Sequence, residues 1–417
     1  MKKCLIIGGG AAGLMCAAKL AKSELPDLQI TIIEQKDNIG YKLLASGNGR
    51  CNLTNILPCR EFCEYGFAKS QARFVRNAIY DFSPAEQLNF FAEHGVEASL
   101  VDGFHYFPKS QKSVDILNVF REIITENNIQ ILYNQQLKSI ITENNLIKSV
   151  VLDNQVLECD FLVISCGGES YPLTGSNGKI FPILQQLGIS LIDRVPALVG
   201  LQTANEAITA LAGNVLPNAS VYIASEPKLI DRGELLFTRT GVSGPAILDL
   251  SGRVNRALHE GADKLEIVIN LNCDYDRDFW HKFFADKRKN FGKKSVRNLL
   301  HEFFFLNLVD WLLAENNINF ERKISELTKK EELNLVESLT NLKLEIIGND
   351  GFKKAIATAG GVDLNEVDSR TLAAKKFNNL FFAGEVLDID GRCGGYNLTW
   401  AFASGAKVAT EIRKLCK

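Results

Sequence analysis

The stretch Cys4-Leu-Ile-Ile-Gly-Gly-Gly-Ala-Ala-Gly13 decides the fold of this chain of 417 residues. Residues 4–7 are apolar and typical of a buried strand, residues 14–21 have the pattern of a helix, and residues 29–34 that of a second strand. Gly8, Gly10 and Gly13 take the glycine positions of the pattern G-x-G-x-x-G. The first permits a tight turn, the second lets the backbone approach a pyrophosphate, and the third lets helix and strand pack closely. The stretch therefore predicts a dinucleotide-binding βαβ unit.

The end of the second strand agrees with this interpretation. Glu34 closes that strand 21 residues after Gly13, where a carboxylate can accept hydrogen bonds from the ribose of an adenosine. The phosphates then lie at the helix N-terminus, where free N–H groups and the helix dipole favour negative charge. The alternative is an ordinary βαβ turn with a surface glutamate. The residues expected to contact the dinucleotide here are Gly8, Gly10, Ala11, Ala12, Gly13, Glu34 and Gln35.

The C-terminal part of the chain indicates which dinucleotide is bound, FAD or NAD. Residues 380–385 (LFFAGE) predict a buried strand that runs into Gly384 and Glu385. A carboxylate at this point can bind the hydroxyls of a ribityl chain, which a nicotinamide dinucleotide lacks. Residues 391–397 (GRCGGYN) then lead into the last helix, whose free N–H groups can face the flavin pyrimidine as negative charge builds on reduction. Together with the N-terminal glycines, this pattern predicts FAD, against the alternative of a core strand, turn and helix.

Five segments, in order along the whole chain, carry a family resemblance. They are GGGAAG (8–13), KLLASGNGRCNLTN (42–55), GGESYPLTGSNG (167–178), GELLFTRTGVSGPAIL (233–248) and FAGEVLDIDGRCGGYNLTWAFASG (382–405). The chain resembles the bacterial NAD(P)/FAD-dependent oxidoreductases related to BaiN, within the glutathione-reductase-like superfamily. The resemblance implies one bound FAD, NAD(P)H as a transient electron donor and a small-molecule substrate.

The resemblance also implies where the cofactor is held. Residues of the second segment would wrap the flavin or its pyrophosphate, the third would lie beside the adenosine diphosphate, and the last beside the ribityl chain and ring. The residues implied in addition to the N-terminal set are Lys42, Leu43, Ser46, Gly47, Gly49, Arg50, Cys51, Asn52, Leu137, Cys166, Gly167, Gly168, Gly384, Glu385, Gly395, Tyr396, Asn397 and Leu398.

The expected fold class is α/β, a two-dinucleotide-binding-type FAD (Rossmann-like) domain with an insert. The FAD domain would comprise residues 1–190 and 345–417, and the β-barrel-like and helical insert residues 191–344; the resemblance supplies the barrel. Apolar patterns predict helices at 72–79, 83–93 and 113–126, an antiparallel meander at 129–133, 137–142 and 147–152, and a strand at 161–165. The insert would have short strands at 195–202, 219–224, 234–237 and 265–271 and be mainly helical over 279–344, and the chain would close with a strand at 379–382 and a helix at 398–414.

Composition argues against several kinds of partner. The net charge of −2 speaks against a nucleic-acid or anionic-membrane surface, so we expect neither partner. The ten cysteines contain no C-x-x-C pair, and with no targeting segment visible a reducing cytoplasm is the simplest location. The five histidines lack metal-ligand spacing, so no metal is expected. The sequence does not indicate an oligomeric state.

The leading functional hypothesis is an FAD-dependent oxidoreductase that moves a hydride between NAD(P)H and a small organic substrate. The alternatives are a flavin-dependent amine or acid oxidase, and an FAD-binding protein acting in RNA modification or sensing. No catalytic acid or base is identified. Tyr171 and Tyr396 are either proton donors or buried tyrosines with satisfied hydroxyls. Arg239 is either a substrate-facing cation or a salt-bridged surface arginine, and Cys51, without a dithiol partner, is expected to have a packing or backbone role.

Overall fold

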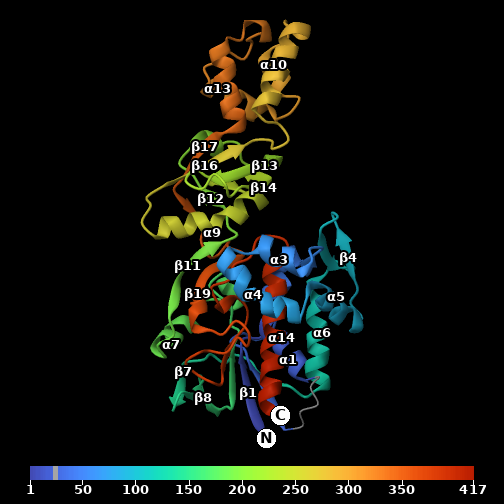
Figure 1. The fold of residues 1–417 in the computed structure, drawn as a ribbon, viewed down its shortest axis with the longest axis vertical. Helices are drawn as coiled ribbons and strands as arrows, with labels where there is room; N and C mark the ends of the chain where they lie inside the picture. Colours follow the sequence, from blue (N-terminus) through green and yellow to red (C-terminus); the bar gives the residue numbers. More distant parts are fainter. Residues whose placement is uncertain (22–26) are drawn as a thin grey trace. The chain divides into compact units, whose positions relative to one another are not determined.

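The computed structural model describes residues 1–21 and 27–417 and divides the chain into two compact units. Unit 1 comprises Met1–Pro196 and Ala355–Lys417, and unit 2 is the segment Ala197–Lys354. Each unit has its own cluster of buried apolar side chains. Both ends of the chain therefore contribute to the same unit (Figure 1).

Unit 1 is built on a parallel sheet of five strands in the order β20-β10-β1-β2-β6. At its centre β1 pairs with β10 and with β2, so that Ile6 lies opposite Val163 on one side and Ile32 on the other. Helices cover the sheet, which is why its strands are apolar runs rather than alternating ones. The order reverses at β1, the switch point at which such sheets bind ligands. The strands are β1 (Lys2–Ile7), β2 (Leu28–Ile33), β6 (Gln130–Leu132), β10 (Phe161–Ile164) and β20 (Leu380–Phe382).

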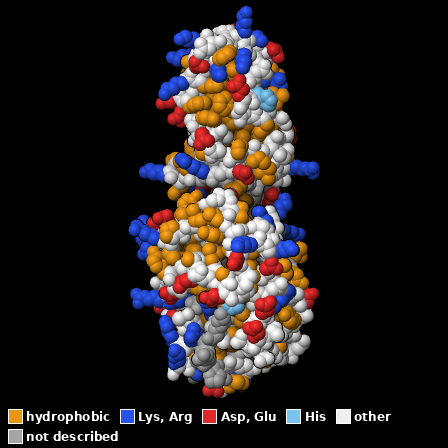
Figure 2. All heavy atoms as spheres, turned by 90° about the vertical axis from the view of Figure 1, so that its right-hand side faces the viewer, with side chains coloured by type: hydrophobic (Ala, Val, Ile, Leu, Met, Phe, Trp, Pro, Cys, Tyr) orange, Lys and Arg blue, Asp and Glu red, His pale blue; other side chains and the backbone are white. Residues whose placement is uncertain are grey.

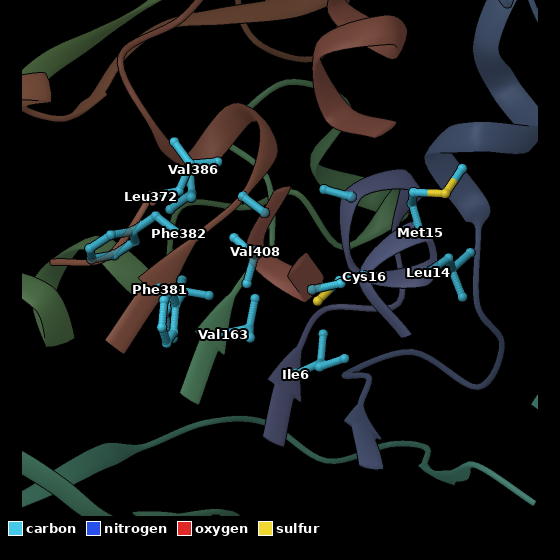
Figure 3. Packing of buried hydrophobic residues seen from close by; sticks show 14 of the residues in the cluster. Ile6, Leu14, Met15, Cys16, Val163, Leu372, Phe381, Phe382, Val386 and Val408 are labelled. Carbon is cyan, nitrogen blue, oxygen red and sulfur yellow. The ribbon is translucent and has the colours of Figure 1, made fainter. Parts of the chain in front are cut away.

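Two helices from opposite ends of the chain pack together against this sheet. They are α1 (Ala11–Ala21) and α14 (Tyr396–Cys416). A Cβ atom placed on Gly405 of α14 would lie 2.2 Å from the Ala12 carbonyl oxygen, so the two backbones are in direct contact. Cys16 of α1 and Val408 of α14 lie beside Ile6 of β1 in the core (Figure 3). The two ends of the sequence are therefore joined through one core.

The predicted helices of unit 1 are confirmed: the first is longer in the structure, the second begins one residue later and the third has the predicted bounds. Ser83 begins one of them with a capping box, in which its hydroxyl and the Glu86 carboxylate satisfy each other's backbone N–H groups. A three-stranded sheet, β3-β5-β4, was not expected from the sequence. The helices are α2 (Tyr41–Ala45), α3 (Cys59–Gly66), α4 (Lys69–Asp81), α5 (Pro84–Glu93), α6 (Ser113–Glu126) and α7 (Ile180–Gln186), and the extra strands are β3 (Thr54–Asn55), β4 (Ala98–Val101) and β5 (His105–Pro108).

The prediction of the antiparallel meander is partly wrong. Its first run, 129–133, forms β6 and pairs in parallel with β2 in the main sheet. The meander itself is β7 (Ser139–Glu143), β8 (Leu146–Val151) and β9 (Val156–Glu158). Alternation of apolar residues identifies a strand but not its partner, so the sequence could not assign β6 to a sheet.

Unit 2 contains an antiparallel sheet of seven strands in the order β17-β16-β13-β14-β15-β12-β18. One long helix, α9, packs on the sheet, and four further helices follow in sequence. The predicted mainly helical region 279–344 is confirmed up to Thr340, after which β17 begins. The helices and strands are β12 (Leu201–Gln202), α8 (Glu206–Thr209), β13 (Val215–Ile223), β14 (Asp231–Phe237), β15 (Gly241–Ser243), α9 (Pro245–His259), β16 (Leu265–Asn270), α10 (Arg277–Phe291), α11 (Val296–Leu300), α12 (Leu306–Glu315), α13 (Lys329–Thr340), β17 (Leu342–Ile346) and β18 (Gly348–Asn349).

The predicted fold class is confirmed as α/β, with a Rossmann-type parallel sheet and additional antiparallel sheets. β11 (Leu191–Ala197) and β19 (Ala357–Val362) form a further two-stranded sheet where the chain passes between the units. All ten cysteines are free thiols. Across residues 1–21 and 27–417, no helix combines the length and the apolar character needed to cross a bilayer.

Candidate cofactor site

The predicted cofactor residues of unit 1 gather at one edge of the parallel sheet. The strands β1, β2, β10 and β20 end at Ile7, Ile33, Ile164 and Phe382, and the carboxyl ends of parallel strands share an edge. The residues that follow these ends are Gly8 to Gly13 after β1, Glu34 and Gln35 after β2, Cys166 to Gly168 after β10, and Gly384 and Glu385 after β20, with Leu137 in the loop after β6. The sheet thus brings together segments from both ends of the chain.

The glycine turn is crowded at Gly8 and Gly13 and open at Gly10. Gly8 has φ = 106°, and a Cβ on Gly13 would lie 2.1 Å from the Gly8 carbonyl oxygen, so neither position admits a side chain. Around the Cβ position of Gly10, by contrast, none of the described residues places an atom within 4 Å. The first turn of α1 therefore has open space in front of it, where its N–H groups can meet phosphate.

Glu34 is held rigidly beside this turn. Its carboxylate accepts the N–H of Gly9 at 2.8 Å and that of Lys36 at 2.9 Å. Burial raises the pKa of Glu34, and these N–H groups oppose the increase because they stabilise the ionised form. A carboxylate oxygen can accept more than one hydrogen bond, so both oxygens retain capacity for ribose hydroxyls. Gly175 closes the far side, since its Cβ position is 3.7 Å from Oε1.

The loop after β10 supplies an unsatisfied polar atom. Gln35 donates from Nε2 to the Gly175 carbonyl at 2.5 Å and accepts from Asn177 at 3.1 Å, which anchors the loop over β2. Ser176, in the same loop, is buried, and within the part of the chain that the structure describes its Oγ has no hydrogen-bond partner. This oxygen lies 2.8 Å from the Cβ position of Gly167. A buried hydroxyl without a partner destabilises a fold, so the site fits a polar ligand such as the diphosphate of FAD.

Glu385 lies in a dense polar network. Its carboxylate pairs with Lys42 Nζ at 2.6 Å, accepts the Ser170 hydroxyl at 3.0 Å and accepts the Thr358 N–H at 2.8 Å. Lys42 also donates to Ser170 Oγ at 2.5 Å. The carboxylate is therefore already well supplied with donors and Ser170 is fully buried, so Lys42, whose side chain is 28% exposed, is the group of this network that can face an anionic or hydroxyl-bearing ligand.

The segment 42–52 wraps the edge of the site with an unusual backbone. Gly47, Gly49 and Cys51 have φ values of 56°, 82° and 63°, which produce a tight loop. Cys51 is fully buried, and burial raises the pKa of its thiol to about 12. A thiol of this kind stays protonated at neutral pH, which favours the predicted packing role. Arg50 is exposed, and its guanidinium carbon lies 4.7 Å from the centre of the Phe107 ring.

The start of α14 is fixed by close backbone contact. Gly395 precedes the helix with φ = 88°, and its Cβ position lies 2.7 Å from the Cα atom of Thr54. The Asn397 amide group donates to and accepts from the backbone of Gly391, each at 2.8 Å. Tyr396 is fully buried, its ring centre 4.6 Å from that of Phe62. The Asn397 amide and the buried Tyr396 ring hold the loop in place and leave its backbone N–H groups to face a ligand.

Two further candidates lie elsewhere. Tyr171 precedes a short 3₁₀ turn in the loop after β10 with φ = 52°, and its side chain is partly buried. Arg239 belongs to unit 2, in the turn between β14 and β15, and its side chain is exposed. None of the described residues forms an ion pair or hydrogen bond with the Arg239 guanidinium.

Three polar residues of the site were not predicted. Ser170 and Ser176 belong to the segment GGESYPLTGSNG, but serine in a glycine-rich loop has no distinguishing pattern. Thr358, in β19, accepts the N–H groups of Glu169 and Ser170 at 2.9 and 3.0 Å. It is separated from Ser170 by the whole of unit 2 in the sequence, so only the folded chain could place it here.

Comparison with known proteins identifies the family. The model of the HI0933-like protein Rossmann domain family matches residues 2–411. The chain belongs to the HI0933-like family. A 3-dehydro-bile acid delta(4,6)-reductase of Clostridium scindens is 30% identical over 97% of this chain and 97% of its own. A ribosomal RNA dihydrouridine synthase of Escherichia coli is 29% identical over 98% of this chain and 97% of its own.

Solved structures agree on the fold of this HI0933-like chain. A 3-ketosteroid delta1-dehydrogenase of Sterolibacterium denitrificans aligns over 100% of both chains with a TM-score of 0.55 and 11% identity, a likeness of fold alone. The expected resemblance to the BaiN-related flavoproteins is confirmed. This HI0933-like protein is an FAD-dependent oxidoreductase.

Proposed function

We propose that this protein passes a hydride from NAD(P)H through bound FAD to a carbon–carbon double bond conjugated to a carbonyl in a small organic substrate. The observation that carries the proposal is the edge of the parallel sheet, where the open turn at Gly10, the carboxylate of Glu34 and the buried hydroxyl of Ser176 fit a dinucleotide. Two full-length relatives, a delta(4,6)-reductase and a dihydrouridine synthase, are named for reductions of double bonds.

The residues at this edge of the sheet would each contact a different part of the cofactor. Glu34 would hold the adenosine ribose, the α1 N-terminus the pyrophosphate, and Lys42, positioned by Ser170, the groups nearer the flavin. FAD would relay a hydride, so that the nicotinamide is oxidised and the double bond gains a hydride and a proton. The chain has no second G-x-G-x-x-G segment in its sequence, so the nicotinamide would dock transiently.

The test is an absorption spectrum of the purified protein, followed by anaerobic addition of NADH and then NADPH. We expect flavin bands that bleach with one of the two nucleotides. Bands that persist with both would overturn the nicotinamide part of the proposal and favour an amine or acid oxidase, which peroxide formation with amines would then reveal. A colourless protein that takes up no added FAD would overturn the proposal entirely.

A second candidate substrate is a pyrimidine within RNA, because α10 of unit 2 has a surface suited to nucleic acid. The rings of Tyr275, Phe279 and Phe283 stack, with centres 4.2 and 6.1 Å apart. Lys287 continues the stripe, its Nζ 5.2 Å from the Phe283 ring centre and 5.1 Å from that of Phe291, which is 47% exposed. Figure 2 shows apolar side chains bordered by Lys and Arg on the helical part of unit 2.

The local charge differs sharply from that of the whole chain. Lys or Arg occupies positions 282, 287, 288, 289, 293, 294 and 297, and Asp286 is the only acid between them in the sequence. Three of these cations, Arg288, Lys294 and Arg297, pair with Glu332, Glu302 and Asp310. Proteins that bind single-stranded nucleic acid combine a positively charged groove with aromatic side chains on which the bases stack. This surface favours a nucleic-acid partner, which the net charge of −2 argued against.

Fluorescence anisotropy with a labelled oligouridine would test the RNA candidate. We expect binding that weakens with salt, and a triple variant K282A/K289A/K293A that lowers both the affinity and the salt dependence. The matched control is K69A/K112A/K375A, which removes three exposed lysines from unit 1 and should bind like the wild type. Equal loss in both variants, or no binding at low salt, would exclude this surface.

A further inference from the structure

One histidine of unit 1 is held by a carboxylate through one ring nitrogen. His105 begins β5, and its Nδ1 lies 2.9 Å from Asp102 Oδ2 and 3.1 Å from Oδ1. Asp102 is in turn fixed, because its Oδ1 accepts the N–H groups of Phe104 and His105, each at 3.1 Å. The carboxylate therefore orients the imidazole and holds the proton on Nδ1, an arrangement found at proton-transfer sites.

The same contacts favour the ionised form of the Asp102 carboxylate. Partial desolvation acts to raise the pKa of Asp102, but the hydrogen bonds from the His105 ring and backbone outweigh it and lower that pKa. A carboxylate that stays ionised stabilises an imidazolium beside it. Asp102 therefore lies beside the imidazole as an ionised hydrogen-bond partner.

The other ring nitrogen faces the loop that leads into α14. The Cβ position of Gly394 is 3.3 Å from His105 Nε2. Asn55 of β3 pairs with His105 in the small sheet and donates from its side chain to the Gly394 carbonyl at 2.8 Å, so sheet and loop form one rigid body. None of the described residues forms a hydrogen bond with Nε2, and the His105 side chain is 29% exposed, which gives it access to solvent.

The imidazole lies between two aromatic rings and a carboxylate. The rings of Phe104 and Phe107 lie 4.9 and 6.5 Å from that of His105, centre to centre. Arg50 lies over Phe107, with its guanidinium carbon 4.7 Å from the ring centre, while Asp102 contacts the imidazole directly.

We infer that His105, oriented by Asp102, is the residue that takes up a proton when the bound cofactor is reduced and delivers it from Nε2 to the substrate. The inference rests on the proposed function, in which the reduced double bond receives a hydride at one carbon and a proton at the other. The Nε2–H bond breaks, a C–H bond forms, and the neutral imidazole regains its proton from solvent. Asp102 is a positioning residue, since it acts only through His105.

The test counts protons and needs no substrate. The full-length protein loaded with FAD is reduced electrochemically through a viologen mediator, in weakly buffered, mildly alkaline solution with a pH indicator. We expect the wild type to take up about one proton per flavin more than the H105Q variant. The matched control is H94Q, which changes the other histidine of unit 1, whose Nδ1 is bonded to the Phe90 carbonyl at 2.6 Å. H94Q should match the wild type.

D102N tests the same inference with His105 in place. We expect it to retain FAD and take up fewer protons than the wild type, and it decides the question if H105Q fails to fold. Equal proton counts in the wild type and in the folded variants would overturn the inference while leaving the proposed function intact. A wild type without flavin bands would overturn the proposed function, and the inference with it.

Discussion

Gly10 and Gly13 occupy one turn, yet a methyl group added to each would meet opposite surroundings. At Gly13 it would lie 2.1 Å from the Gly8 carbonyl oxygen and 2.6 Å from Ser165 Oγ, whereas at Gly10 it would meet no described atom within 4 Å. A clash with backbone cannot be relieved by rotating a side chain. Gly10 therefore leaves space for a ligand, whereas Gly13 is needed for close packing within the fold.

This contrast gives a paired prediction. G13A should destabilise the protein by about 3 kcal/mol, with or without FAD, because the core must shift to admit the methyl group. G10A should leave the melting temperature of the FAD-free protein unchanged and weaken FAD binding, since it fills the space in front of α1. Thermal melting with and without FAD measures both effects. An FAD-free G10A protein as unstable as G13A would contradict the assignment.

Cys51 gives a prediction from its pKa. With the pKa raised to about 12 by burial, only roughly one thiol in ten thousand is ionised near pH 8. The native protein should therefore not be alkylated at Cys51 by iodoacetamide, and labelling should appear only on unfolding, as mass spectrometry of the peptides would show. Rapid labelling of Cys51 in the folded state would restore the redox interpretation.

At the scale of elements, the contact between α1 and α14 decides whether the two ends of the chain form one domain. Replacing Gly405 by Ala inside a helix normally stabilises by up to about 1 kcal/mol. Here the methyl group would lie 2.2 Å from the Ala12 carbonyl oxygen, and overpacking costs about 1–3 kcal/mol. The cost of overpacking is larger than the gain in helix propensity, so we expect G405A to lower the melting temperature.

The control for G405A lies on the same helix. Thr410 is exposed, so T410A should change stability by no more than about 0.5 kcal/mol. Denaturant unfolding of both variants, followed by circular dichroism, measures the difference. If G405A were as stable as T410A, the helices could separate without cost and the close backbone contact would be refuted.

At the scale of the whole molecule, the two units have separate cores. A substitution that destabilises the core of one unit should therefore leave the other unit folded. Trp280 is buried in unit 2, among Phe284, Phe303 and other rings of that unit. W280A should destabilise unit 2 by about 3–5 kcal/mol while FAD stays bound in unit 1. Calorimetry together with flavin fluorescence would show an early transition without FAD release. Simultaneous release of FAD would mean that the units unfold as one.

The sequence by itself determined the features that depend on local pattern. The glycines from Gly8 to Gly13, the apolar strand before them and Glu34 after the next strand are neighbours along the chain, so their spacing was enough to predict the βαβ unit and its ligand class. The helices 69–81, 84–93 and 113–126 follow from apolar spacing and, at Ser83, from a capping pattern.

Only the tertiary structure decided the features that depend on distant contacts. The placement of β6 in the main sheet, the enclosure of the Tyr396 ring, and the meeting of Thr358 with Glu385 all join residues far apart in sequence. The pairing of His105 with Asp102 is local, but its significance comes from Gly394 across the fold. Apolar periodicity records which face of an element is buried and not which element covers it, so these partners became known only when the chain was folded.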